Sequence, residues 1–371
     1  MRDSAVKSTV ICGGVVVAIV VLTSCAQFAR SNSGDVQPAV HDATSIFSLA
    51  SALRRNTTTL TSRTTSLALD RIDQRQLPLD ATYRRSGSGR GVTVYVFDGG
   101  VSTTHPELAG RVRTGFTAFP SDPKICNAHG TAVAGAIAGA TLGVAPEAEI
   151  VDVKMVQCGT LRGTIKGIVD GAKWAIEDHA IRGGPAVANW SFIADTAAVI
   201  PALDSAVADL RAAGISVIVS AGNADVNACR VSPANSAGTI VVGATTVDID
   251  TTGGEPHPVD KRAKDTAWGP CIDVFAPGDS VLLPSLDMDA HPITQLWNGT
   301  SMATGYVSGA AALFLQVAPK ATPNEVADFI RRTSTPRVVS DAKSPVARML
   351  FVGVPGAAPP VATTTLARRP K

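Results

Sequence analysis

Asn298-Gly299-Thr300-Ser301-Met302-Ala303 places one serine among small residues, shortly before an apolar run from Val307 to Val317. The run has helical periodicity, which predicts that Ser301 lies at the start of a helix. At a helix start, the free backbone N–H groups and the positive end of the helix dipole favour a developing negative charge. A serine hydroxyl is a poor nucleophile without a base, and the base needs a residue that orients it. If Ser301 is a nucleophile, the rest of the chain must supply both partners.

Length and composition set broad bounds on the kind of protein. The chain has 371 residues, which suffices for one large domain or two ordinary ones. Hydrophobic residues make up 45% of the chain and 33 residues are glycine, which fits a closely packed α/β core. The formal net charge is only +2 and the basic residues are scattered, so we expect no nucleic-acid partner.

Residues 1–25 have the pattern of an export signal. Arg2 and Lys7 precede a short apolar core from Ile11 to Leu22, which is too short for a comfortable membrane span. The core ends in Leu22-Thr23-Ser24-Cys25, which resembles a bacterial lipobox and predicts lipidation of Cys25. The alternatives are an ordinary cleaved signal peptide or an uncleaved signal anchor. We therefore expect an exported protein of the cell envelope, held at a membrane by a lipid or signal anchor, or secreted.

Composition divides the remaining chain into three parts. Residues 26–64 are rich in Ser and Thr and poor in large apolar groups, which predicts a flexible tether with at most a short helix within residues 43–55. Residues 65–352 carry the apolar patterning of one folded domain. Residues 353–371 are rich in Pro, Ala and Thr, which predicts a disordered tail.

Strand-like and helix-like stretches alternate along the folded domain. The expected strands are Val92 to Phe97, Ile150 to Lys154, Ala186 to Trp190, Ile215 to Ser220 and Thr239 to Ala244. The expected helices are His129 to Ala140, Thr164 to His179 and Val199 to Ala213, with a later one opened by the capping box Thr322-Pro323-Asn324-Glu325. This alternation predicts an α/β fold, a doubly wound and mainly parallel sheet with helices on both faces.

Two residues that could serve Ser301 lie at expected element ends. Asp98 follows the first strand, where functional groups of such sheets gather, and His129 opens a helix of small residues. Taken singly, the acid could be a cap, the histidine structural and Gly-Thr-Ser an ordinary turn. The chain order Asp, His, Ser is more specific, because the order of a catalytic triad differs between unrelated folds.

Four stretches carry a resemblance to a known family. They are VYVFDGGV around Asp98, NAHGTAVAG around His129, SAGNADVNAC around Asn223 and NGTSMA around Ser301. Together they resemble the subtilisin-like serine proteases (peptidase S8), in particular the proteinase K and aqualysin branch, over about residues 67–318. The resemblance implies a three-layer α/β/α fold and a serine endopeptidase that cleaves protein or peptide substrates through an acyl-enzyme.

The same resemblance assigns roles to individual residues. Ser301 would attack the scissile carbonyl, His129 would transfer the proton, and Asp98 would orient the imidazole. Asn223 would donate its side-chain amide to the oxyanion, with the Ser301 backbone N–H as the second donor. The alternative for Asn223 is that it only satisfies a turn after the preceding strand.

Substrate-binding segments are implied in the same way. In the family, substrate lies along segments that correspond here to Ser191–Ile193 and to part of Val153–Gly159. The S1 pocket would be bordered by Ser191, Phe192, Ile193, Ser220, Ala221 and Gly222. Trp190 and Phe192 could instead be ordinary core or surface aromatics. The family usually has Gly at the position of Ile193, so a β-branched side chain there should narrow the S1 entrance or tilt the adjoining strand.

Cysteine usage agrees with an exported chain. Outside the predicted signal, four cysteines remain, and an even number in an exported protein indicates disulfides. The residues alone allow three pairings. The resemblance implies Cys126–Cys158 and Cys229–Cys271.

The resemblance implies no cofactor for the chemistry, but it makes structural calcium plausible. Asp273 with the carbonyl oxygens of Ala237 and Thr239 is the site expected by position. The alternative is that Asp273 makes an ordinary turn or salt bridge.

Several positions depart from the family pattern. Gly99 replaces a small hydroxyl residue, Ala132 replaces a second histidine, and Gly305-Tyr306 replaces Pro-His. About 40 residues separate Cys25 from the domain, which is shorter than the usual propeptide, so we expect no complete one.

These departures motivate a second hypothesis, a catalytically weakened or inactive surface-displayed binding protein on a subtilisin-like scaffold. A lipase or esterase fits poorly, because Ser301 is followed by Met302-Ala303 instead of x-Gly and the acid and histidine precede it. Under either of the first two hypotheses we expect a monomer.

Overall fold

The computed structural model describes residues 59–194, 198–251, 255 and 257–353, all within one compact unit that spans residues 46–371. The predicted signal, Cys25, most of the tether with its short helix, and the tail beyond Gly353 lie outside the described residues. Among the residues that are described, none of the helices combines the length and hydropathy that a membrane crossing needs.

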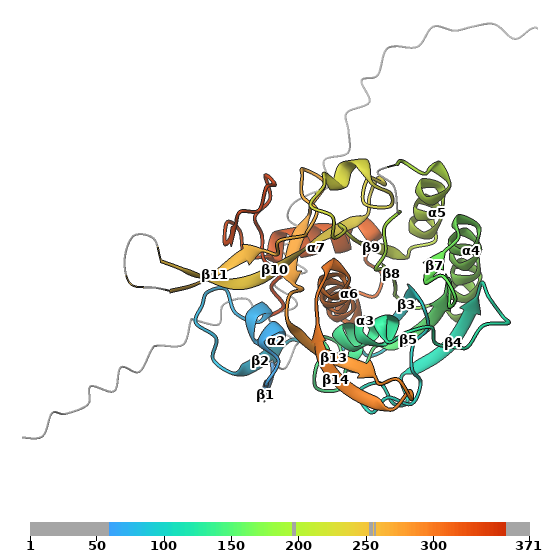
Figure 1. Ribbon diagram of the computed structural model, residues 1–371, viewed down its shortest axis with the longest axis horizontal. Helices are drawn as coiled ribbons and strands as arrows, with labels where there is room; N and C mark the ends of the chain where they lie inside the picture. The colour runs from blue at the N-terminus through green and yellow to red at the C-terminus, as the bar shows by residue number, and fades with distance from the viewer. Residues whose placement is uncertain (1–58, 195–197, 252–254, 256, 354–371) are drawn as a thin grey trace, which may run out of the picture. The chain divides into compact units, whose positions relative to one another are not determined.

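A twisted sheet forms the centre of the domain (Figure 1), with strand order β15-β11-β10-β9-β8-β3-β5-β4 and β12 paired to β10. Its strands are β3 (Thr93–Asp98), β4 (Val112–Thr117), β5 (Glu149–Lys154), β8 (Ala186–Trp190), β9 (Ser216–Ser220), β10 (Ile240–Asp250), β11 (His257–Arg262), β12 (Val274–Pro277) and β15 (Val339–Ser340). Every pairing in this sheet is parallel except β10 with β11. The predicted doubly wound, mainly parallel sheet is confirmed.

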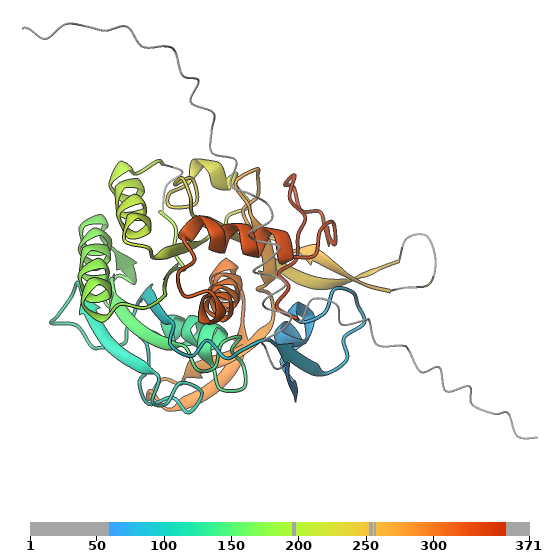
Figure 2. The ribbon, with the colours of Figure 1, turned by 180° about the vertical axis from the view of Figure 1, so that it is seen from behind.

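Helices cover both faces of the sheet, as Figures 1 and 2 show from opposite sides. They are α2 (Leu67–Ile72), α3 (His129–Ala138), α4 (Ile165–Arg182), α5 (Pro201–Ala212), α6 (Thr300–Val317) and α7 (Pro323–Thr333). Alternate residues of each central strand face opposite apolar clusters, Val94 and Val96 toward the cluster of α3 and α6, and Tyr95 and Phe97 toward that of α4 and α5. Burial on both faces explains why β3 is an almost continuous apolar run.

Local signals explain where several helices begin. Thr322 caps α7 in a complete capping box with Glu325, and Thr164 caps α4 by accepting from the Gly167 N–H at 3.0 Å.

Gly305 lets α6 approach α3, because a Cβ added there would lie 2.8 Å from the Ala136 Cβ. The glycine that replaces the family's proline therefore has a packing role.

Short antiparallel pairs lie outside the central sheet. They are β1 (Leu60–Arg63) with β2 (Thr82–Arg85), β6 (Val156–Gln157) with β7 (Arg162–Gly163), and β13 (Val281–Leu286) with β14 (Pro292–Trp297). Strand β1 falls inside the last residues of the predicted tether, so the boundary at residue 64 is wrong at that end. Its sequence, Leu-Thr-Ser-Arg, lacks the apolar alternation by which a half-buried strand is recognised, and all four residues are exposed.

Candidate active site

The carboxyl ends of the central strands meet where the strand order reverses around β3. After β3 the chain passes to β4 and β5 on one side and later to β8 and β9 on the other. In open α/β sheets this reversal creates the crevice in which ligands bind. Asp98 ends β3, Ser191 follows β8, and Ser220 ends β9, so the predicted site residues gather at this edge.

Asp98 and His129 are in direct contact. The His129 Nδ1 lies 2.8 Å from the Asp98 Oδ2, while the Asp98 Oδ1 accepts from the Gly99 N–H at 2.7 Å. The Asp98 side chain is 6% exposed and that of His129 is 30% exposed. The carboxylate therefore holds the imidazole by one nitrogen and leaves Nε2 for proton transfer on the accessible side.

The electrostatics of this pair favour an imidazole that takes up a proton readily. Burial disfavours the charged imidazolium, but the charge of Asp98 and the hydrogen bond to it outweigh that cost and raise the pKa of His129. A general base works best when its pKa lies near the working pH. The imidazole of His129 is therefore a stronger base than a free imidazole.

Glycine at position 130 permits the close approach of α3 to β3. A Cβ added at Gly130 would lie 2.5 Å from the Gly100 carbonyl oxygen and 3.0 Å from the Asp98 Cβ. Any larger residue would therefore push His129 away from Asp98. The Trp297 ring stands edge-on to the imidazole, with ring centroids 6.2 Å apart, and lines the other side of the histidine.

Ser301 is the second residue of α6, as its position before the apolar run predicted, and it is 7% exposed. Its hydroxyl donates to the Ser191 carbonyl oxygen at 3.2 Å, and the Ser191 hydroxyl donates to the Ser301 carbonyl oxygen at 3.2 Å. Within the described part of the chain, no hydrogen bond joins Ser301 to His129. The structure thus unites Asp98 with His129, whereas the Ser301 hydroxyl is hydrogen-bonded to the Ser191 carbonyl oxygen.

Asn223 lies in the loop after β9 and is held by the residue before Ser301. Its Oδ1 accepts from the Thr300 N–H at 2.9 Å and from the Thr300 Oγ1 at 3.0 Å. Thr300 Oγ1 in turn accepts from the Gly222 N–H at 3.2 Å. With its oxygen so engaged, Asn223 keeps its Nδ2 hydrogens for another acceptor next to the α6 N-terminus. Sequence reasoning missed Thr300, which joins these segments.

The two expected borders of the S1 pocket lie side by side. Ser220 Oγ donates to the Phe192 carbonyl oxygen at 3.2 Å, and the Phe192 ring stacks on Trp190 with centroids 5.3 Å apart. The Ile193 side chain reaches across to Gly222, where an added Cβ would lie 3.0 Å from the Ile193 Cδ1. Ile193 therefore occupies space between the two segments.

Both expected disulfides are present, Cys126–Cys158 and Cys229–Cys271. The Cys126 N–H donates to the Gly99 carbonyl oxygen at 2.8 Å, so the first disulfide lies beside the residue that follows Asp98. The sulfur atoms of this bridge are close to a carboxylate oxygen of Asp122, but disulfide sulfurs offer no thiolate to a metal.

The expected calcium ligand Asp273 has other partners. Its Oδ1 accepts from the Arg331 Nε at 2.8 Å, and its Oδ2 accepts from the Val241 N–H at 2.9 Å. Both oxygens are thus engaged, which favours the alternative of a salt bridge over a calcium site with Ala237 and Thr239.

A different set of oxygen atoms lies where α2 meets β2. Asp70 accepts from the Asp80 N–H at 3.1 Å and Asp73 accepts from the Arg84 N–H at 2.6 Å. Asp73 Oδ1 and Gln74 Oε1 are buried without a hydrogen-bond partner in the described residues. Burial raises the pKa of Asp73 to about 7, since hydrogen bonding and Arg84 compensate only in part. Carboxylate and amide oxygens left in this state suit a hard cation such as Ca²⁺.

The fold and this geometry define an α/β protein with a carboxylate–imidazole pair and a serine at a helix start. The sequence pattern of the subtilase family, peptidase S8, matches residues 89–350, and the chain belongs to this family.

Relatives agree with this assignment. The chain is 40% identical to the extracellular serine proteinase of Thermus sp. (strain Rt41A) over 276 residues, 74% of this chain and 62% of that protein. It is 38% identical to alkaline serine exoprotease A of Vibrio alginolyticus over 285 residues, 76% of this chain and 49% of that protein. The chain thus spans between about half and two thirds of the length of these relatives.

A solved structure is similar as well. It is the crystal structure of a cold adapted subtilisin-like serine proteinase, with a TM-score of 0.68 and 37% sequence identity. The match covers 78% of this chain and 99% of that one.

Proposed function

We propose that this protein is an exported serine endopeptidase that hydrolyses peptide bonds through a Ser-His-Asp triad and an acyl-enzyme. The observation that carries the proposal is the 2.8 Å contact between His129 and Asp98, at the strand edge where α6 begins with Ser301. Names of the relatives, an extracellular serine proteinase among them, support the reaction type and the export.

Each group has a distinct task in this reaction. Ser301 Oγ attacks the scissile carbonyl after it turns from Ser191 toward His129, which takes the proton and returns it to the leaving amine. Asp98 fixes the imidazole tautomer and stabilises the imidazolium. Asn223 Nδ2 and the Ser301 N–H stabilise the oxyanion, where a preorganised donor contributes most. Substrates are proteins or peptides, and no cofactor takes part.

Anchoring belongs to the same proposal. A lipid on Cys25 would hold the enzyme at a membrane of the cell envelope, and the enzyme acts as a monomer. Radiolabelled palmitate that attaches to the wild type and fails to attach to Cys25→Ser supports the lipid anchor. Equal labelling of both proteins contradicts it.

A fluorophosphonate probe tests the function directly. We expect the folded wild type to be labelled and to cleave peptide substrates, and Ser301→Ala to do neither, because only an activated serine reacts with the probe. Ser205→Ala, which changes an exposed serine on α5, is the matched control and should behave as the wild type.

The hydrogen bond from Ser301 to the Ser191 carbonyl favours the second candidate, a weakened protease that acts as a binding protein. The same probe separates the two. Absence of labelling on folded wild type supports the binding protein, and labelling that persists in Ser301→Ala contradicts the assigned nucleophile.

A structural calcium ion is part of the proposed function, and its protein ligands would be the side-chain oxygens of Asp73 and Gln74. The buried, unpartnered oxygens of Asp73 and Gln74 support this site. Arg84 contacts Asp73 Oδ2 at 3.3 Å, so the ion would use Asp73 Oδ1. Both oxygens of Asp70 accept backbone N–H groups, and those of Asp80 accept from Thr82 and Arg84, so neither residue is assigned as a ligand.

Calcium should therefore stabilise the folded enzyme. We expect EDTA to lower the Tm by about 5 °C and excess Ca²⁺ to restore it, because a ligand that binds only the folded state raises its stability. Asp73→Asn should abolish this response, whereas Asp273→Asn should keep it. If only Asp273→Asn loses the response, calcium binds at Asp273 with Ala237 and Thr239 instead. If EDTA does not change the Tm of the wild type, neither calcium site exists.

A further inference from the structure

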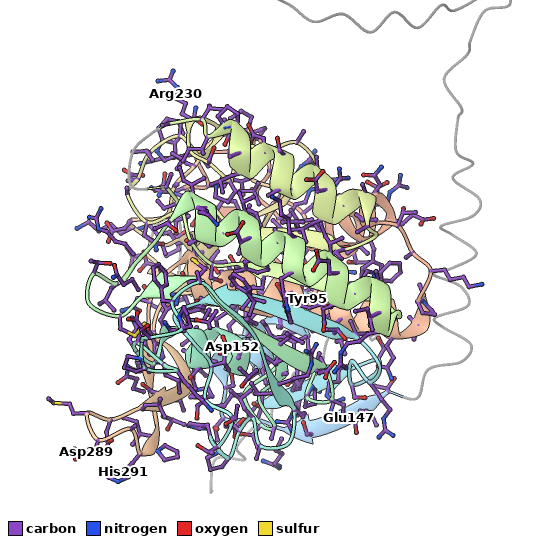
Figure 3. All side chains as sticks on the ribbon, turned by 90° about the vertical axis from the view of Figure 1, so that its right-hand side faces the viewer. Tyr95, Glu147, Asp152, Arg230, Asp289 and His291 are labelled. Carbon is purple, nitrogen blue, oxygen red and sulfur yellow. A yellow bond between two sulfur atoms is a disulfide. The ribbon has the colours of Figure 1, made fainter. Side chains whose placement is uncertain are left out.

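Asp152 is a buried carboxyl group beside the carboxylate that holds His129. It lies in β5 opposite Val96 of β3, and Asp98 is two residues further along the same strand. Paired residues of parallel strands share a face, and alternate residues return to it, so Asp152 and Asp98 point to the same side of the sheet. Asp152 is 5% exposed, and Figure 3 shows it among the central strands.

The Asp152 carboxyl contacts the loop that follows Asp98. The Val101 N–H donates to it, whereas Asp152 Oδ1 has no hydrogen-bond partner among the residues that the structure describes. Between Asp98 and Val101 the loop passes over the start of α3, where the Gly100 carbonyl oxygen leaves no room for a side chain at Gly130. Asp152 thus fixes the far end of a loop that carries Asp98 and abuts the first turn of α3.

Two charged side chains act on this carboxyl, those of Asp98 and Lys154. The carboxylate of Asp98 contacts the imidazole of His129 on α3. Lys154 follows on β5, is 3% exposed, and lies 3.5 Å from Asp122 of the loop after β4. Burial raises the pKa of Asp152 to about 7 and Asp98 adds to the rise, while the Val101 N–H and Lys154 oppose it. Asp152 therefore changes charge near neutral pH, next to the Asp98–His129 pair.

We propose that Asp152 is a positioning residue of the candidate active site: its buried carboxyl holds the Val101 end of the Asp98 loop and lies as a second acid beside the Asp98–His129 pair. Only the expected effect of Asp152 on kcat rests on the proposed function. A loop anchored by a neutral acid keeps Asp98 in place without a second negative charge beside it.

The sign of the electrostatic effect follows from the charges. Ionised Asp152 stabilises the imidazolium, so it raises the pKa of His129 and delays the appearance of the neutral base as the pH rises. The pKa of Asp152 is higher in the folded than in the unfolded chain, so the folded state binds more protons between about pH 4 and pH 7. The contribution of Asp152 to stability must therefore fall as the pH rises through this range.

Asp152→Asn removes the titration and keeps an acceptor for Val101. We expect NMR titration of the His129 ring to give a pKa lower by about half a unit than in the wild type. The Tm of the variant relative to the wild type should rise by about 5 °C between pH 5 and pH 9. Neither measurement requires peptidase activity, so both remain informative if the proposed function fails.

Two further variants separate positioning from mere burial of a carboxyl. Asp152→Ala removes the acceptor for Val101 and should lower kcat about tenfold with little change in KM, and Asp152→Asn should restore most of the loss. Asp178→Asn is the charge control on the opposite face: Asp178 bonds to Arg113 at 2.6 Å and to Tyr95 at 2.9 Å, which outweigh burial and lower its pKa. Its loss should cost stability at neutral pH, and this cost should shrink as the pH falls below the ordinary Asp pKa of about 3.9.

The proposal has defined failures. An identical His129 titration in the wild type and Asp152→Asn would overturn the electrostatic link, as would a Tm difference that does not vary with pH. If Asp152→Ala and Asp152→Asn lower kcat equally, the Val101 contact does not position the loop.

Discussion

Replacement of His129 by alanine is expected to lower kcat by about 10⁶-fold, and Asp98→Asn by about 10⁴-fold. The first value is that of the corresponding loss in subtilisin, a member of the same family, and the second is that of a triad whose imidazole is held in the wrong tautomer. The larger loss follows from removal of the base itself. The smaller one follows because an amide at position 98 can still contact Nδ1 but cannot stabilise the imidazolium.

The pH dependence gives this prediction a second readout. Hydrolysis needs the neutral imidazole, so activity should be lost as the pH falls through the raised pKa of His129. The acid limb of kcat/KM should therefore lie above the ordinary histidine value of about 6.5. Asp98→Asn removes the charge that raises this pKa, so its residual activity should persist to lower pH.

Steady-state kinetics from pH 4 to 10 on the three proteins measure both effects. His291→Ala is the matched control, because its side chain is 71% exposed and pairs with Asp287 on the β13–β14 hairpin. An acid limb unmoved in Asp98→Asn would contradict the role of the carboxylate, even if the rates fell as expected.

The parts of the fold that could be predicted are those whose patterning is local. Strand β3 is an apolar run closed by an acid, and α7 has its capping box in the sequence, so both were recognised within a residue or two. The order of Asp98, His129 and Ser301 sufficed to name them as a set. Their family resemblance added Asn223 and both disulfide pairings.

Features that depend on distant partners were not predictable in this way. Strand β14 is mostly exposed and exists because it pairs with β13, and the extension of β10 beyond Ala244 pairs with β11. Asp152 sits inside an expected strand, where an acid breaks the apolar run, and that break was the available signal. Its meaning depends on Val101 and Asp98, which only the folded chain brings together.

The second large expected effect concerns Ile193 and the preference of the enzyme for the P1 residue of its substrate. The Ile193 side chain lies between the two segments that we expect to border the S1 pocket, and it reaches Gly222 on the far side. A P1 side chain would have to enter this space, so we expect the wild type to prefer alanine over phenylalanine at P1. In a hydrophobic pocket, a single methylene group changes the ratio of kcat/KM between two substrates by about 10-fold to 200-fold.

Ile193→Gly is therefore expected to raise the ratio of kcat/KM for phenylalanine over alanine at P1 by about 10²-fold. Peptide p-nitroanilides that differ only at P1 measure this ratio. Glycine also loosens the backbone, so Ile193→Ala is needed to isolate the side chain, and it should give most of the change. Ile249→Gly, at an exposed position of β10, serves as the control for a glycine introduced into an extended segment. If the ratio rises in Ile193→Gly but not in Ile193→Ala, the tilt of the backbone sets the P1 preference, and the Ile193 side chain does not. If neither variant changes the ratio, the P1 side chain binds elsewhere.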